Sequence, residues 1–151
     1  MVSRFELFAT SISCIYHYIQ KIERVEMEHY GLKGPHAQCL LAMGRYPEGI
    51  TAARLCEACD KDKAAISRTV AELEQEGMIQ RDMKDGNRYR AQLILTEQGK
   101  TAAGQVEERV KLAVEKAGDG MTDEQRSILY EVLGMIAGHL QTICEEGLEN
   151  V

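Results

Sequence analysis

Basic, hydroxyl and small side chains gather within two helical turns near the middle of this 151-residue chain. Arginine can donate two parallel hydrogen bonds to the edge of a guanine, which is the commonest specific contact between a protein and DNA. Alanine and serine add little bulk, so a helix that carries them can approach a groove closely. The candidate contacts are Lys63, Ala64, Ala65, Ser67, Arg68 and Thr69. Arg68 is the first candidate for base contact; the alternative is an exposed ion pair with Glu72, one helical turn away.

These residues belong to a segment, 62–77, that predicts a short helix with defined ends. Asp62 is a good N-cap because its carboxylate can accept a backbone N–H of the first turn. Gly77 can take the left-handed conformation that ends a helix. Residues at spacings of three and four predict one buried stripe of Ile66, Thr69, Val70 and Leu73. The glutamates at 72, 74 and 76 make the second half acidic, so only residues 63–69 are expected to touch DNA.

A second short helix is predicted directly before this one. Thr51 caps residues 51–59, and Asp60 and Lys61 form a tight turn into the next helix. Two short helices joined in this way predict a helix-turn-helix, whose second helix enters the major groove. The N-terminus at Thr51 could also hold a phosphate through its backbone N–H; the plainer role of Thr51 is a simple cap.

A basic hairpin is predicted directly after Gly77. Residues 78–84 and 88–95 have strand-like patterns, and Asp85, Gly86 and Asn87 form a tight turn between them. A hairpin in this place is the wing of a winged helix. Arg88 could enter the minor groove, where the negative potential is enhanced. The candidate contacts of the wing are Lys84, Asn87, Arg88 and Arg90.

Long helices are predicted at both ends of the chain, over residues 3–29, 96–117 and 122–146, with a further helix over 36–45. Apolar residues recur in heptad-like seams that exceed the needs of a small core, so part of them is expected to pack on a second copy. The predicted dimerisation residues are Phe5, Phe8, Ile12, Leu133, Ile136, Leu140 and Ile143. The expected fold is mainly α with a minor β part. Residues 1–151 would form one subunit, with a DNA-binding lobe at 34–95 and a helical dimerisation region at 1–30 and 96–151.

The charge and the cysteine content indicate which partners and which cellular compartment suit the chain. The net charge is −6, yet residues 61–90 hold seven basic and six acidic residues, a balance of +1, which leaves −7 for the remainder. A locally basic face on an acidic body fits a selective DNA reader, and it also fits an ordinary soluble protein. No apolar run approaches the ~18 residues of a membrane span, and no secretory signal is evident. Five cysteines without a disulfide-scaffold spacing predict reduced thiols and a cytoplasmic location.

The order of these elements resembles the multiple antibiotic resistance regulator (MarR) family. The most specific stretches are residues 55–79, LCEACDKDKAAISRTVAELEQEGMI, and residues 87–99, NRYRAQLILTEQG. The family often has Gly-Leu in the turn between the two short helices, where this chain has Asp60 and Lys61. The family also often has Asp at the wing tip, where this chain has Asn87.

The resemblance implies a transcriptional regulator, usually a repressor, that binds double-stranded DNA as an obligate homodimer. A dimer also follows from physics, because a two-fold dimer that reads two half-sites of a pseudo-palindromic operator gains affinity and specificity together. Many members are released from DNA by a small phenolic or other organic effector. By that likeness, Tyr16, Tyr30 and Met43 would border an effector cleft.

Several cysteines and histidines leave other roles open. Cys56-x-x-Cys59 invites a redox or metal reading, but it lacks a second ligand pair, and both thiols suit core positions. Cys14 lies on the first long helix, where a peroxide-sensing branch of the family carries a reactive cysteine nearer the helix start. His36-x-x-Cys39, with Glu28 and His29 nearby, would suit a zinc sensor. The scattered set His17, His29, His36, Cys39 and His139 is not dense enough to predict zinc, and no cofactor is expected.

Three function classes are therefore distinguished. The first is a sequence-specific dimeric repressor, with a metal- or thiol-sensing regulator of the same fold as a variant. The second is a winged-helix module that binds other proteins instead of DNA, which the near-neutral charge of residues 61–90 leaves open. The third, an enzyme, is least favoured because no paired carboxylates, nucleophile elbow or phosphate loop is present.

Overall fold

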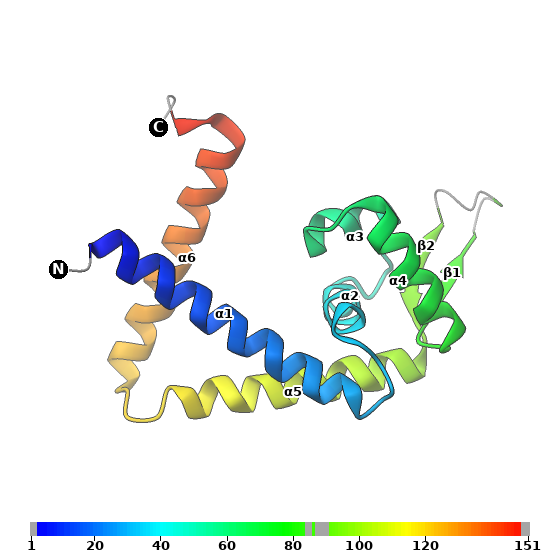
Figure 1. The fold of residues 1–151 in the computed structure, drawn as a ribbon, viewed down its shortest axis with the longest axis horizontal. Coiled ribbons are helices and arrows are strands. Elements are labelled where there is room, and N and C mark those ends of the chain that lie inside the picture. The colour runs from blue at the N-terminus through cyan, green and yellow to red at the C-terminus, as the bar shows by residue number, and fades with distance from the viewer. Residues whose placement is uncertain (1–2, 84–85, 87–90, 149–151) are drawn as a thin grey trace. The chain divides into compact units, whose positions relative to one another are not determined.

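The computed structural model describes residues 3–83, 86 and 91–148. Within these residues the chain forms helices and one antiparallel pair of strands, as the sequence predicts (Figure 1). In chain order the elements are α1 (Arg4–Glu28), α2 (Gly34–Gly44), α3 (Ala52–Cys59), α4 (Lys63–Gln75), β1 (Ile79–Asp82), β2 (Gln92–Leu95), α5 (Glu97–Ala117) and α6 (Asp123–Glu146). The chain divides into two compact units, residues 1–112 and residues 113–151.

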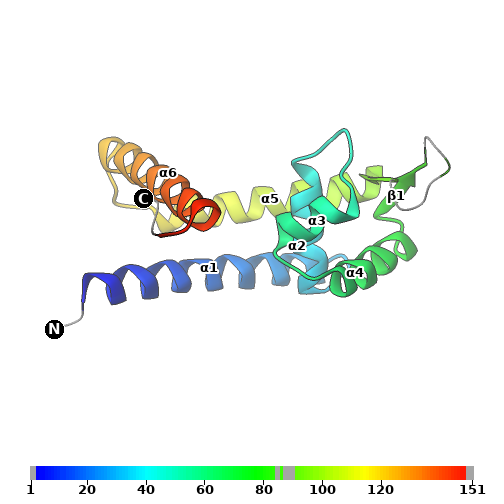
Figure 2. The same ribbon diagram turned by 90° about the horizontal axis from the view of Figure 1, so that it is seen from above.

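The first unit is built around one hydrophobic core. Leu40 and Met43 of α2, Leu55 of α3, Leu73 of α4 and Leu93 of β2 are all almost fully buried in it. From α1 only the C-terminal end joins this core, through the fully buried Met27. The N-terminal half of α1 extends away from the lobe formed by α2, α3, α4 and the two strands (Figures 1 and 2).

Local caps define the ends of α3 and α4. The Thr51 hydroxyl accepts a hydrogen bond from the Arg54 N–H at 3.3 Å, and Asp62 Oδ1 accepts one from the Ala65 N–H at 2.8 Å. Both predicted N-caps are thus confirmed. Between the two helices, Asp60 adopts the left-handed conformation with φ 49° and ψ 51°. A non-glycine residue pays a steric penalty there, so the turn carries strain that a glycine would not have.

The C-terminal end of α4 is closed by a Schellman motif. The Gly77 N–H donates to the Glu74 carbonyl at 3.0 Å, and the Met78 N–H reaches back to the Leu73 carbonyl at 2.9 Å. Gly77 has φ 72°, as predicted for its position after the helix. Since Met78 belongs to this motif, β1 begins at Ile79, one residue later than the predicted strand.

The two strands pair antiparallel, with Ile79 opposite Leu95 and Asp82 opposite Gln92. Leu93 and Leu95 are buried while their neighbours are partly exposed, which agrees with the predicted alternation. A further backbone pairing joins Ile50 to Leu93 through two hydrogen bonds of 3.0 and 2.8 Å. The segment before α3 is therefore held on the open edge of β2, a contact that the sequence patterns do not reveal.

Thr96 and Gly99 hold the start of α5 against the end of α4. The Thr96 hydroxyl donates to the Gly77 carbonyl at 2.6 Å and accepts from the Gly99 N–H at 3.1 Å. The Thr96 N–H donates to the Met78 carbonyl at 3.0 Å. Gly99 is buried so closely that an added Cβ would lie 1.9 Å from the Met78 carbonyl oxygen. Only glycine fits at this crossing.

The second unit contains the end of α5 and all of α6. Thr122 and Gln125 form the predicted capping box, in which each side chain bonds the backbone N–H of the other residue. Arg126 donates to the Gly118 carbonyl at 3.2 Å, which ties the first turn of α6 to the preceding turn. α6 has no buried residue. Among the described residues, no helix combines the length and apolar content that a membrane span requires.

Candidate nucleic-acid interface

The first two turns of α4 present most of the predicted DNA contacts on the surface. Lys63, Ala64, Ser67 and Arg68 are exposed, and Ala65 is half-buried. Thr69 is different, because it is only 8% exposed and lies in the buried stripe with Ile66, Val70 and Leu73. Its inclusion among the DNA contacts needs correction, since a helix position that faces the core cannot also face a groove.

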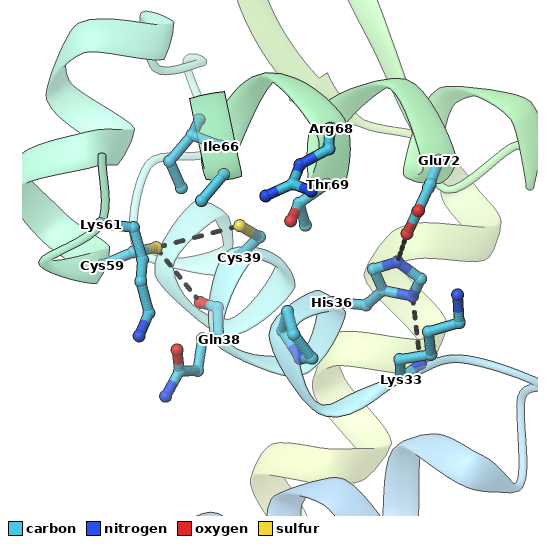
Figure 3. A pocket seen from close by; sticks show the side chains of 12 residues that line it. Lys33, His36, Gln38, Cys39, Cys59, Lys61, Ile66, Arg68, Thr69 and Glu72 are labelled. Carbon is cyan, nitrogen blue, oxygen red and sulfur yellow. Dashed lines mark hydrogen bonds and ion pairs between the residues drawn. The ribbon is translucent and has the colours of Figure 1, made fainter. Parts of the chain in front are cut away.

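A cavity of about 380 Å³ lies between α2, the end of α3 and α4. Arg68 lines it from α4, together with Lys33, His36, Cys39, Cys59 and Lys61 (Figure 3). Arg68 therefore stands at the border between the exposed front of α4 and this cavity. Three cationic side chains and one carboxylate, Glu72, line this hollow, which leaves a positive balance of +2 beside the helix-turn-helix.

Two acidic residues in the second half of α4 form contacts within the first unit. Glu72 Oε2 lies 2.6 Å from His36 Nε2, and Glu74 accepts two hydrogen bonds from Arg81 of β1, at 2.8 and 3.3 Å. These contacts join α4 to α2 on one side and to the sheet on the other. Glu72, which was the partner of Arg68 in the alternative interpretation, contacts His36 instead, and this interaction holds the helix in place.

The His36–Glu72 contact has a defined polarity. His36 is 5% exposed, and its Nδ1 accepts a hydrogen bond from the Lys33 N–H at 3.1 Å, so the ring proton lies on Nε2 and is donated to Glu72. This hydrogen bond, helped by the charge of Lys33, lowers the pKa of the Glu72 carboxyl below its ordinary value of 4.5. Glu72 therefore remains ionised at neutral pH.

His36 and Cys39, the two residues that suggested a zinc site, are engaged in other contacts. Both ring nitrogens of His36 are engaged, and the Cys39 thiol faces Cys59 at 4.0 Å. No group of three or more His, Cys, Asp or Glu side chains in the described ranges could hold a metal ion. The imidazole serves to connect α2 to α4.

The remaining predicted contacts fall in two places. Thr51 is half-buried and caps α3, which is the simpler of the two roles expected for it. The predicted wing contacts Lys84, Asn87, Arg88 and Arg90 lie outside the described residues.

The three residues expected at an effector cleft differ in burial. Met43 is 1% exposed and belongs to the core, so its assignment to the cleft was wrong; its side chain fills the centre of the lobe instead. Tyr16 is 59% exposed on α1. Tyr30 borders a hollow, which lies between the end of α1 and α5, and its hydroxyl donates to Gln105 Oε1. Arg109 lines the same hollow and contacts Glu26 at 3.4 Å.

The predicted dimerisation residues are largely uncovered within the chain. Phe5 is 76% exposed and Leu140 is 50% exposed. Phe8, Ile12 and Leu133 are also exposed, and Ile136 and Ile143 are partly exposed. Removing large apolar side chains from water lowers the free energy, so each of these helix faces is a candidate for an interface.

A helix pair of this geometry, followed by an antiparallel strand pair and preceded by a third helix, defines a winged helix-turn-helix protein. Residues 30–86 match the family model for the MarR family, so this segment is similar to the winged helix-turn-helix of that family. No curated protein matches the chain.

Solved structures extend the likeness to the whole described fold. A MarR transcriptional regulator from Methanosarcina mazei Go1 aligns with a TM-score of 0.78 and 24% identity, covering 91% of this chain and 92% of that one. A MarR family transcriptional regulator from Listeria monocytogenes, complexed with 26mer DNA, aligns with a TM-score of 0.75 and 21% identity, covering 93% and 91%. A MarR family regulator from Silicibacter pomeroyi has a TM-score of 0.76 at 16% identity, with coverage of 91% and 92%. The chain thus has the MarR fold.

Two pairs at the site are absent from the sequence predictions. His36 with Glu72 and Cys39 with Cys59 are separated by 36 and 20 residues, so no local pattern connects them. A buried histidine on an otherwise apolar helix was the available signal for the first pair, because a buried polar group requires a partner. For the second, the signal was that cysteines stood on two helices predicted to pack in one small lobe.

Proposed function

We propose that this protein is a sequence-specific DNA-binding transcriptional regulator, a homodimeric repressor that binds a pseudo-palindromic operator. The observation that carries the proposal is the exposed, small and cationic front of α4 within a winged helix-turn-helix. The Listeria relative with the same fold is complexed with DNA, which supports the same partner here. Such a regulator would work in the cytoplasm, where bacterial DNA lies.

The charge distribution supports DNA over a protein partner. Glu74 and Arg81 pair with each other and their charges cancel, whereas Glu72 keeps its negative charge behind the first two turns of α4. The turn before α4 and the exposed first two turns of this helix have three cations, at positions 61, 63 and 68, and one carboxylate, Asp62, which gives +2. The front of the helix is therefore more basic than the +1 of residues 61–90 indicates, as phosphate binding requires.

Binding to DNA is tested with a salt-titrated gel shift on the promoter fragment upstream of its gene. Arg68→Ala should weaken specific binding by ~1–3 kcal/mol, because it removes a base contact. Lys111→Ala, which removes one exposed charge from α5, is the matched control and should bind as the wild type does. If wild-type protein does not bind at low salt, the proposal fails, and a winged-helix module for protein partners replaces it.

The homodimer is proposed from the exposed apolar side chains of α1 and α6. Phe5, Phe8 and Leu140 would be covered by the same helices of a second copy, which also places two recognition helices for two half-sites. Analytical ultracentrifugation should give twice the chain mass of 16.9 kDa. A monomer at micromolar concentration would contradict this part of the proposal.

A small organic effector is proposed to bind at the hollow that Tyr30 borders. Its Glu26, Tyr30, Gln105 and Arg109 side chains offer a tyrosine ring, an amide and a guanidinium to a phenol or carboxylate. An effector releases DNA only if it binds the DNA-free state more tightly than the DNA-bound state. A thermal-shift screen of salicylate-like phenols, repeated on Tyr30→Phe and Arg109→Ala, tests the location; ligands that bind both variants unchanged would place the site elsewhere.

A further inference from the structure

Two cysteines from different helices meet in the cavity beside α4. Cys39 Sγ, on α2, and Cys59 Sγ, at the last residue of α3, lie 4.0 Å apart (Figure 3). A disulfide needs a sulfur–sulfur distance of about 2.05 Å, so a closure of about 2 Å would join them. Cys39 is 2% exposed, whereas Cys59 is half-buried and lines the cavity, through which a small molecule can reach it.

The surroundings assign different roles to the two thiols. The hydrogen bond with Cys39 lowers the pKa of the Cys59 thiol, against the opposing effect of burial, and the charges of Lys61 and Arg45 lower it further. The same hydrogen bond, together with burial, raises the pKa of the Cys39 thiol. Cys59 is thus the thiolate former and the nucleophile, and Cys39 is the thiol that resolves its oxidised product.

We propose that Cys59 and Cys39 form a reversible thiol–disulfide site that responds to a hydroperoxide and weakens DNA binding when oxidised. The consequence for DNA rests on the proposed function, whereas the chemistry of the site does not. In a reducing compartment the pair stays reduced until an oxidant appears, as expected for a sensing disulfide.

The reaction is balanced with a hydroperoxide as the oxidant. The Cys59 thiolate attacks the peroxide, an S–O bond forms, the O–O bond breaks, and the departing alkoxide takes up a proton to leave as an alcohol. The Cys39 thiol then attacks the Cys59 sulfenic acid; the S–S bond forms, the S–O bond breaks, and water leaves with the Cys39 proton. Two electrons pass from the two thiols to the peroxide, and a dithiol reductant reverses the step.

The site is coupled to α4 through the turn that follows Cys59. Asp60, Lys61 and Asp62 occupy this turn, and the Lys61 N–H is held by the Cys56 carbonyl at 3.0 Å. Asp62 is the N-cap of α4. The share of this closure of about 2 Å that side-chain rotation does not supply would fall on the turn, because the turn starts at the residue after Cys59. Hydrogen bonds from α4 to base edges lose most of their energy over a smaller displacement.

The other thiols serve as controls. Cys14 on α1 and Cys144 on α6 are exposed, and Cys56 faces the core one helical turn before Cys59. Cys56→Ser is the most demanding control, because it lies in the same helix and close to the pair. If the assignment is correct, oxidation of this variant should still join Cys39 to Cys59.

Peptide mapping tests the site without any reference to DNA. After treatment with one equivalent of hydrogen peroxide, trypsin should release residues 34–45 linked to residues 55–61. Fragment ions that cut between Cys56 and Cys59 should place the bond on Cys59. Cys39→Ser should accumulate a sulfenic acid on Cys59 that dimedone traps, and Cys59→Ser should form neither product. A bond to Cys56, or disulfides confined to Cys14 and Cys144, would overturn the assignment.

A second measurement tests the consequence for DNA. Peroxide should weaken operator binding of the wild type and of Cys56→Ser at least tenfold, dithiothreitol should restore it, and Cys59→Ser should be unaffected. If the mapped disulfide forms and the affinity stays within twofold, the coupling to α4 is wrong. If reduced wild-type protein binds no DNA, the proposed function fails, while the peptide map still decides whether the thiol site exists.

Discussion

Gly99→Ala is expected to destabilise the protein by about 2–4 kcal/mol, although alanine is normally the better helix residue. Gly99 lies in the first turn of α5, where the helix crosses the chain after α4. An added Cβ would lie 1.9 Å from the Met78 carbonyl oxygen and 3.3 Å from Leu95 Cδ2. Real Cβ atoms essentially never approach another atom within 3.0 Å, so helix and carbonyl must separate by at least about 1 Å.

The magnitude follows from what this separation disturbs. Overpacking a well-packed crossing typically costs about 1–3 kcal/mol. The Thr96 N–H bond to Met78 and the Thr96 hydroxyl bond to Gly77 cross the same junction, and each contributes about 1 kcal/mol. The gain in helix propensity from glycine to alanine offsets about 1 kcal/mol. The sum is a loss of about 2–4 kcal/mol, or roughly 5–15 °C in Tm for a chain of this size.

Gly104→Ala is the matched control in the same helix. Nothing lies within 4 Å of the Cβ that alanine would add there, and the position is exposed. This variant should be more stable than the wild type by about 0.5–1 kcal/mol, because it gains helix propensity without a clash. Urea unfolding followed by circular dichroism, at one protein concentration for all three proteins, measures both changes. If Gly99→Ala were as stable as Gly104→Ala, the close crossing of α5 and Met78 would be wrong.

Three further outcomes are expected. Asp60→Gly should raise Tm by roughly 2–4 °C, because it relieves the left-handed strain and removes a carboxylate from the C-terminal end of α3, and Asp60→Ala should not. The hydrogen bond from His36 lowers the pKa of folded Glu72, so this carboxyl stabilises the fold above its ordinary pKa of 4.5 and loses that effect as the pH falls through the lower folded value. Urea unfolding of Glu72→Gln should therefore depend less on pH below 4.5 than that of the wild type; identical pH profiles would exclude the contact. Leu140→Asp should shift the sedimenting species toward a monomer while helicity is kept, and an unchanged dimer would remove α6 from the proposed interface.

Helix ends were the most predictable part of the fold. Asp62, Thr51 and the Thr122–Gln125 capping box each act on a backbone group no more than three residues away. Such contacts depend on residue type and short spacing alone. The predicted order of helices and strands is confirmed for the same reason, because a stripe with period 3.6 or 2 is a local property.

The assignment of side chains to the core or the surface was less predictable. Met43 and Thr69 were assigned in part to an effector cleft and to DNA, and both are buried. A helical pattern shows which residues share a face, but the width of the buried face depends on what packs against it. In this lobe α2 is covered on several sides, so six of its eleven residues are buried.

From local spacing alone, the sequence determined the winged helix-turn-helix, its caps and the exposed, basic front of α4. Tertiary structure alone decided which long-range partners meet: His36 with Glu72, Glu74 with Arg81, and Cys39 with Cys59. The physical reason is distance along the chain. A cap or a stripe is encoded within a few residues, whereas these pairs exist only after α2, α3, α4 and β1 have packed around one core. That packing explains why the helix predicted to read DNA ends in glutamates that hold it in place, and why its first turn lies next to a pair of thiols.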